Sequence, residues 1–421
     1  AVLADIFAAW PQVADAEEQR AHHAFRAERG DDLISFATFE ALSHAMAKSG
    51  RGAGSARWPA DLATRSAPGV TAFANEQADA IGFHAWLQFI ADRQLAEVQR
   101  SARAAGMRIG LYLDLAVGTA PDGHANWADP DLSLKGVTVG APPDLFSTEG
   151  QSWGLAPLAP GVLQARRYAP YRAMLAAVMR HAGAVRIDHA MGLERLWLVP
   201  HGETAKRGAY VRQPGLVDEV VAATHRHQTI AIGEDLGIVP PGFRERMNAR
   251  RLFSMRIAMF EREGARGRYP VLRPPARYPG DALACVSTHD FAPLEAWWGE
   301  DDLAIREALG TLSQGNGAAE RRDRHDVKVS LMNLMGLPPR MASEPLTDTV
   351  VVAYHRMVAR TACRMMAVRL EDVLGGKRLV NLPGTDREHP NWRHTLPLDV
   401  DAVITSPLLS RVLSAVRAVR P

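Results

Sequence analysis

The stretch AVRIDH at residues 184–189 decides the fold, because it is a short apolar run that ends in a carboxylate and a histidine. A helical pattern at residues 174–181 precedes it. The same succession recurs further along the chain, where a helical pattern at 217–227 leads into TIAIGED at 229–235. Strands that alternate with helices pair in parallel, and apolar strands of this kind are covered on both faces. The chain is therefore predicted to have an α/β fold.

Other units of this rhythm lie on both sides of that stretch. A helix predicted at 78–105 from its apolar spacing leads into MRIGLYLD at 107–114. Further short apolar runs cover residues 254–260, 282–288 and 378–382, the last of them weak. The sequence thus offers about six strands, whereas a closed (β/α)8 barrel needs eight.

Composition limits the classes of partner. The chain has 421 residues, of which 47% are hydrophobic, so it can bury a sizeable core. Its 49 Lys and Arg against 47 Asp and Glu give a net charge of +2, too small to steer nucleic acid or an anionic membrane. No apolar stretch reaches the ~20 residues that span a bilayer. The two cysteines cannot form a disulfide framework, and a cytoplasmic location is expected.

Carboxylates stand at the predicted C-terminal ends of four strands, at Asp114, Asp188, Glu234 and Asp290. A single acid in such a place is more often a helix N-cap or a surface group. Four in successive units indicate a site, because the C-terminal face of a parallel barrel carries catalysis. Like charges held close together separate their pKa values, so one carboxyl can stay protonated while another is ionised. This combination suits glycoside chemistry.

Metal-assisted hydrolysis is the alternative chemistry, since Asp188 with His189, and Asp290 with His289, could supply carboxylate and imidazole ligands. The His-x-His pair at 225–227 lies at the end of a predicted helix and before a strand, which is the wrong face for a ligand pair. The residues therefore favour glycoside chemistry over a metal centre.

Six segments, in family order, resemble the 4-α-glucanotransferases of glycoside hydrolase family 77, also called amylomaltases or disproportionating enzymes. One segment alone is modest evidence, whereas all six in order are specific, and the form HAMGLERLWLVP resembles the longer bacterial subtype. The resemblance implies a (β/α)8 TIM barrel of the α-amylase type with insertions. The segments are IGLYLDLAVG (109–118), GAPPDLFSTEGQSWG (140–154), VRIDHAMGLERLWLVP (185–200), IGEDLGIVP (232–240), STHD (287–290) and NLPGTDREHPNW (381–392).

The resemblance implies a role for each of three acids. Asp188 resembles the nucleophile that forms a β-glycosyl-enzyme intermediate, Glu234 the general acid/base, and Asp290 the third acid, which holds sugar hydroxyls. The implied reaction transfers α-1,4-glucan segments between maltooligosaccharides with retention of configuration, and it requires no metal or organic cofactor. A hydrolase on the same scaffold and an inactive glucan-binding remnant are the alternatives.

The other matching residues are expected to bind substrate. Arg186 precedes Asp188 by two residues, so both side chains should point to the same face of their strand. Its permanent cation would keep Asp188 ionised and oriented. Gln151 and Trp153 match a loop that closes over the acceptor side. The further expected substrate-binding residues are His189, His289, Asp114, Asp144 and Asn381.

The whole chain, residues 1–421, is expected to form one catalytic barrel with three departures from the βα rhythm. Residues 1–80 are predicted to be a helical subdomain. Residues 116–170 are too long for an ordinary βα loop, so we expect a loop or subdomain over the active site. Residues 298–376 are predicted to be a helical insertion before the last strand. The first two strands of the family have no counterpart here, so an N-terminally truncated barrel is expected.

Overall fold

The computed structural model divides the chain into two compact units. The first unit contains Ala1–Ala231 and Gly237–Pro240, and the second contains Ile232–Leu236 and Pro241–Pro421. The residues that the structure describes are 2–143, 149–266, 269–312, 316–385 and 388–420.

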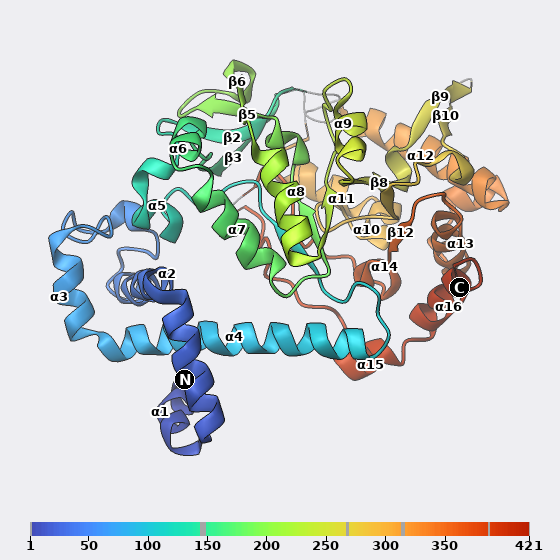
Figure 1. Cartoon of the computed structure of the whole chain (residues 1–421). Coiled ribbons are helices and arrows are strands. Elements are labelled where there is room, and N and C mark those ends of the chain that lie inside the picture. The colour runs from blue at the N-terminus through green and yellow to red at the C-terminus, as the bar shows by residue number, and fades with distance from the viewer. Residues whose placement is uncertain (1, 144–148, 267–268, 313–315, 386–387, 421) are drawn as a thin grey trace. The chain divides into compact units, whose positions relative to one another are not determined.

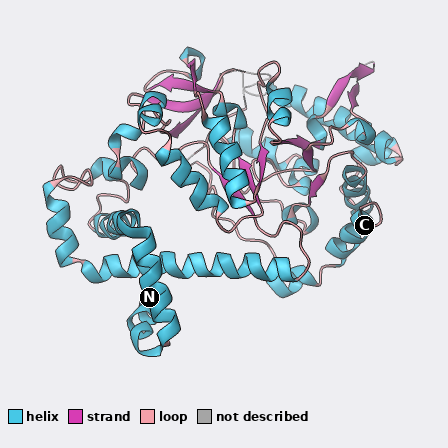
Figure 2. Ribbon diagram, viewed as in Figure 1, coloured by secondary structure: helices cyan, strands magenta, loops and turns pink. Residues whose placement is uncertain are grey.

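The first unit begins with helices (Figure 1, blue to cyan; Figure 2). Helices α2 and α4 pack together and bury Leu33 and Ala37 against Ile81 and Ala85, all at helical spacing. Gly30 interrupts the helical dihedrals of α2 with a φ of 50°, a value that glycine tolerates without steric cost. The helices are α1 (Val2–Val13), α2 (Ala16–Lys48), α3 (Pro68–Glu76) and α4 (Ala78–Ala104).

Two parallel strands of the first unit follow helices as predicted. The strand β1 (Tyr112–Leu115) follows α4 and pairs in parallel with β4 (Ala184–Ile187), whose four residues are all buried. Helix α7 (Ala169–Met179) precedes β4, and helix α8 (Leu216–His227) precedes β7 (Ile230–Gly233). The alternation of helix and buried strand therefore has the order that the apolar runs indicated.

A separate antiparallel sheet with the order β3-β2-β5-β6 interrupts this alternation. It buries Val139 with Leu196 and Leu198, and Trp153 packs against that cluster. The segment 116–170 supplies half of these strands together with short helices. The elements are α5 (His124–Ala128), β2 (Val137–Ala141), β3 (Gln151–Leu155), α6 (Pro160–Ala165), β5 (Arg195–Pro200) and β6 (Ala209–Arg212).

The second unit continues the parallel pairing from the end of β7. In it β8 pairs with β7 and β11, and β11 pairs with β12. Its strands are β8 (Phe253–Ile257), β9 (Arg262–Arg266), β10 (Tyr269–Leu272), β11 (Ala282–Cys285) and β12 (Met365–Ala367). Its helices are α9 (Phe243–Ala249), α10 (Leu294–Gly299), α11 (Asp301–Ala308), α12 (Asn316–Met335), α13 (Asp348–Ala359), α14 (Leu370–Val373), α15 (Val400–Ile404) and α16 (Pro407–Arg417).

The last strand differs from the prediction. It is formed by Met365–Ala367, which lie in the segment 298–376 predicted to be a helical insertion, whereas residues 378–382 form no strand. The run at 378–382 is enclosed by Gly375 and Gly376 on one side and by Pro383 on the other, and these residues break regular structure. The shorter run at 365–367 becomes a strand because β11 offers it a free edge.

Within the described residues, the strand pairs β1–β4, β7–β8, β8–β11 and β11–β12 are all parallel. The predicted α/β fold is confirmed at this level. Short 3₁₀ helices complete the secondary structure, at Ser55–Arg57, Pro130–Leu132, Ala190–Leu193, Ala205–Arg207, Ala258–Phe260, Pro275–Arg277 and Pro339–Ser343. Among the residues described, no helix has the length and apolar character needed to span a membrane.

Candidate active site

A buried guanidinium joins two of the predicted site acids in the first unit. Arg186 on β4 lies directly opposite Asp114 on β1 in the parallel register. Its Nη1 donates to both carboxylate oxygens of Asp114 at 3.0 and 2.9 Å. The same nitrogen lies 2.8 Å from Oδ1 of Asp188, just beyond the end of β4. Because Arg186 is only 5% exposed, its charge is weakly screened and favours the ionised form of Asp188.

The antiparallel sheet brings two further predicted residues to the same end of β4. The ring of Trp153 on β3 meets the ring of His189 edge to face, with centroids 5.1 Å apart. Its Nε1 donates to Oε1 of Gln151 at 3.0 Å. Desolvation lowers the pKa of His189 to about 4, so this imidazole is neutral at pH 7 and can exchange hydrogen bonds with a hydroxyl group. His189, Gln151 and Trp153 are thus one local group.

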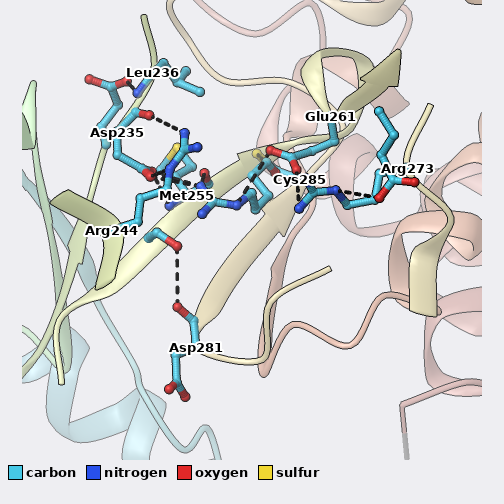
Figure 3. A network of polar contacts seen from close by, with 12 residues as sticks. Asp235, Leu236, Arg244, Met255, Glu261, Arg273, Asp281 and Cys285 are labelled. Carbon is cyan, nitrogen blue, oxygen red and sulfur yellow. Dashed lines mark hydrogen bonds and ion pairs between the residues drawn. The ribbon is translucent and has the colours of Figure 1, made fainter. Parts of the chain in front are cut away.

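Glu234, the predicted general acid/base, belongs to the second unit. It follows β7 directly and is 8% exposed. Its Oε1 accepts a hydrogen bond from the backbone N–H of Leu236 at 2.7 Å. Sequence reasoning gave no role to the next residue, Asp235, which is 1% exposed and lies among arginines (Figure 3). A second acid directly after the strand-end acid is the signal that could have found it.

Asp290 is the centre of a second cluster in this unit. Its Oδ2 lies 3.3 Å from Nε2 of His289, and its Oδ1 accepts a hydrogen bond from Nδ2 of Asn381 at 3.0 Å. The ring of Trp392 packs against His289, with centroids 5.0 Å apart. Trp392 is 62% exposed and has a φ of 59°, a left-handed value that costs a bulky residue free energy. Sequence reasoning missed it, although it closes the NLPGTDREHPNW segment.

The predicted site residues therefore gather in groups within each unit. The first unit joins Asp114, Arg186 and Asp188, and the second joins His289, Asp290 and Asn381. Asp144 lies in 144–148, outside the residues that the structure describes. Within the described ranges, no group of three or more His, Cys, Asp or Glu side chains could hold a metal ion. The catalytic and substrate-binding roles stay predictions.

Comparison with known proteins identifies related chains. The family model of glycoside hydrolase family 77, described as 4-alpha-glucanotransferase, matches residues 1–399. The 4-alpha-glucanotransferase of Mycobacterium tuberculosis is 38% identical over an alignment of 413 residues, which covers 96% of this chain and 56% of that protein. The 4-alpha-glucanotransferase of Haemophilus influenzae is 37% identical over 325 residues, or 74% of this chain and 45% of that protein. The chain thus spans about half the length of the curated relatives it matches.

Solved structures agree with the family match. The amylomaltase from Corynebacterium glutamicum superposes with a TM-score of 0.82 at 28% identity, over 99% of this chain and 58% of that one. The amylomaltase from Streptococcus agalactiae in complex with acarbose gives a TM-score of 0.73 over 96% of this chain and 75% of that one. At 18% identity, this second likeness shows the fold alone. With almost its whole length matched by the family model, the chain belongs to glycoside hydrolase family 77, the family of the 4-alpha-glucanotransferases.

Proposed function

We propose that this protein transfers α-1,4-glucan segments from one maltooligosaccharide to another by a retaining double displacement. The observation that carries the proposal is the contact between Arg186 and Asp188, in which a buried cation lies 2.8 Å from a strand-end carboxylate in a chain of this family. A carboxylate held ionised and oriented in this way is prepared for nucleophilic attack.

The proposed reaction assigns one step to each acid. Asp188 attacks the anomeric carbon while Glu234 donates a proton to the leaving glucosyl oxygen, so a covalent glycosyl-Asp188 ester replaces the glycosidic bond. Glu234, now ionised, accepts the proton of an incoming sugar hydroxyl as that oxygen displaces Asp188. Retaining chemistry of this kind requires the two carboxyl groups roughly 5–5.5 Å apart in the working enzyme.

Asp290 and its neighbours are proposed to hold the sugar ring at the cleavage point. His289 and Asn381 already orient Asp290 through contacts at 3.3 and 3.0 Å, so its carboxylate can accept hydrogen bonds from sugar hydroxyls without a search through rotamers. The neutral imidazole of His189 offers a further partner for a hydroxyl group. Because the chain belongs to the family of the 4-alpha-glucanotransferases, we propose that α-1,4-linked oligosaccharides bind to it.

Transfer exceeds hydrolysis only where a sugar outcompetes water for the glycosyl intermediate. We propose that segment 116–170 favours transfer by covering the acceptor side, with Gln151 and Trp153 as its contacts. Asp144 is included in the proposal through its match to the family segment alone. The parallel strands of the chain are proposed to be part of a (β/α)8 barrel, whose C-terminal face would carry all three acids.

The test is incubation of the chain with maltotriose, followed by chromatography of the products. Transfer yields glucose together with longer maltooligosaccharides and leaves the number of reducing ends constant. A net gain of reducing ends would instead support the hydrolase, and binding of maltotriose without turnover would support a glucan-binding remnant. The variant Asp188→Asn should bind maltotriose but produce no new oligosaccharide, which excludes a contaminating activity.

A further inference from the structure

Asp235, the residue after the candidate acid/base, is held on three sides. Its Oδ1 accepts a hydrogen bond from the backbone N–H of Met255 at 2.9 Å. Nη1 of Arg256 donates to both carboxylate oxygens at 3.2 and 2.9 Å. Nε of Arg244 on α9 donates to Oδ2, the contact drawn with the other two in Figure 3. A carboxylate that is 1% exposed thus has charged or amide donors for both oxygens.

The cation on β8 is itself fixed by a chain of charges. Arg256 is 4% exposed, and its Nε lies 3.6 Å from Oε1 of Glu261. Oε2 of Glu261 lies 3.3 Å from Nη1 of Arg273 (Figure 3). Burying such charges costs desolvation free energy, so an ion pair of this kind is weak evidence for added stability. What it supplies is a defined position for Asp235 relative to β8.

Arg244 extends this control to the main chain. Its Nη2 donates to the carbonyl oxygen of Asp235 at 2.9 Å. That carbonyl belongs to the same peptide group as the N–H of Leu236, and this N–H donates to Oε1 of Glu234 at 2.7 Å. Because a peptide group is planar and rigid, fixing its oxygen also fixes the direction of its N–H. Arg244 and Asp235 therefore determine where the hydrogen bond to Glu234 points.

We propose that Asp235 and Arg244 are positioning residues for Glu234, which they act on through the peptide group between Asp235 and Leu236. The inference rests on the proposed function, because it takes Glu234 as the general acid/base. The oriented N–H holds the Glu234 carboxyl in one rotamer and stabilises the carboxylate that forms when Glu234 has given up its proton. Neither residue is required to touch substrate.

Two assays distinguish a loss of acid/base positioning from a general loss of structure or activity. The first is disproportionation of maltotriose, which needs proton transfer in both steps. The second is fluoride release from α-maltosyl fluoride in the presence of azide. In that reaction the C1–F bond breaks as the ester to Asp188 forms, and an azide nitrogen then displaces the carboxylate from C1. Fluoride leaves without protonation and azide attacks without a base, so the second assay bypasses Glu234.

The reference variant is Glu234→Gln, which should lose roughly 10²–10⁴-fold in the maltotriose assay and little in the azide assay. Asp235→Asn and Arg244→Met should also lose more activity in the maltotriose assay than in the azide assay. Their maltotriose transfer should fall on the order of 10- to 100-fold. Arg244 lies partly exposed at the surface, so its variant keeps the test available where Asp235→Asn fails to fold. Arg246→Met is the matched control, because Arg246 is an exposed arginine of the same helix.

Each outcome decides a different claim. The positioning role would be overturned if Asp235→Asn and Arg244→Met each lost as much activity in the azide assay as in the maltotriose assay. It would also be overturned if neither variant lost more activity than Arg246→Met. Both outcomes would leave the proposed function intact. Full maltotriose transfer by Glu234→Gln would overturn the acid/base assignment itself. A wild-type chain that turns over neither substrate would overturn the proposed function and this inference together. A biased loss in both variants supports the inference.

Discussion

Asp188 and Glu234 both stand just beyond the end of a parallel strand, and the structure shows a different type of polar contact at each. Asp188 lies 2.8 Å from the guanidinium of Arg186, whereas Glu234 accepts a backbone N–H at 2.7 Å. Beside Glu234, the arginine charges of Arg244 and Arg256 bind the neighbouring Asp235. A cation placed on an acid keeps it ionised, as a nucleophile requires. A peptide N–H orients an acid that has to gain and lose a proton in each cycle.

The largest expected effect tests the difference between Asp188 and Glu234 directly. Asp188→Asn should lower maltotriose transfer by roughly 10⁴-fold or more, because it removes the atom that forms the covalent bond. The loss should persist with α-maltosyl fluoride and azide, in contrast to Glu234→Gln. Fluoride release is the measurement. Rescue of Asp188→Asn by azide to the level of Glu234→Gln would show that the two acids do not have the different roles proposed.

A smaller effect is expected when the arginine beside Asp188 is replaced by lysine, which has the same charge but a different shape. Arg186→Lys should lower kcat for maltotriose on the order of 100-fold, because the flexible lysine stem does not hold its ammonium at the position of Nη1, which contacts both Asp114 and Asp188. Stopped assays at saturating substrate provide kcat, and circular dichroism checks the fold. An unchanged kcat in a folded variant would remove the basis of the proposed nucleophile.

The buried acid Asp372 shows the effect of desolvation where it is the largest influence on a carboxyl pKa. Burial raises the pKa of Asp372 on α14 to about 6, although its Oδ1 accepts the backbone N–H of Leu294 at 2.8 Å. Since the folded pKa lies above the unfolded value, its contribution to stability is present below pH ~4 and is lost as the pH rises through about 6. Asp372→Asn should therefore gain about 2 kcal/mol relative to wild type between pH 4 and pH 7.

Urea unfolding at the two pH values measures this gain. The sign is the informative part, because a carboxylate held ionised by a cation would respond in the opposite direction. A difference between Asp372→Asn and wild type that stays constant from pH 4 to pH 7 would contradict the role of burial.

The smallest expected effect concerns the Asp290 group. Trp392 presents a 62% exposed ring beside His289, and a pyranose face can pack on such a ring. Trp392→Ala should weaken the binding of maltotriose by about tenfold, and Trp392→Phe should restore most of it. Isothermal titration with Asp188→Asn as the background avoids turnover. Equal affinities of the alanine and phenylalanine variants would exclude a stacking role for Trp392.

Much of the parallel alternation could be predicted because it depends on local patterns. The runs that became β4, β7 and β11 are apolar, short and preceded by a helix or a turn, so their burial on both faces could be predicted from the sequence. The strand at Met365–Ala367 could not be predicted in this way. It is three residues long, and pairing with β11 decides its conformation more than its own sequence does.

The residues of the candidate site also fall into those that the sequence could locate and those that it could not. The acids Asp188, Glu234 and Asp290 could be located because each follows a strand and lies in a family segment. Trp392 and Arg244 could not, since their relevance depends on contacts that cross 103 and 9 residues of sequence respectively, to His289 and Asp235. Spacing along a chain does not indicate which distant side chains meet.

The sequence by itself indicated glycoside chemistry, because carboxylates after four of the predicted strands and the order of six family segments are properties of the chain. Tertiary structure alone decided how each acid is prepared. It placed Arg186 between Asp114 and Asp188, and it turned the Asp235–Leu236 peptide toward Glu234. The physical reason is that a charge or a hydrogen bond acts over a few ångströms in space. Only the folded chain brings residues from different strands within that range.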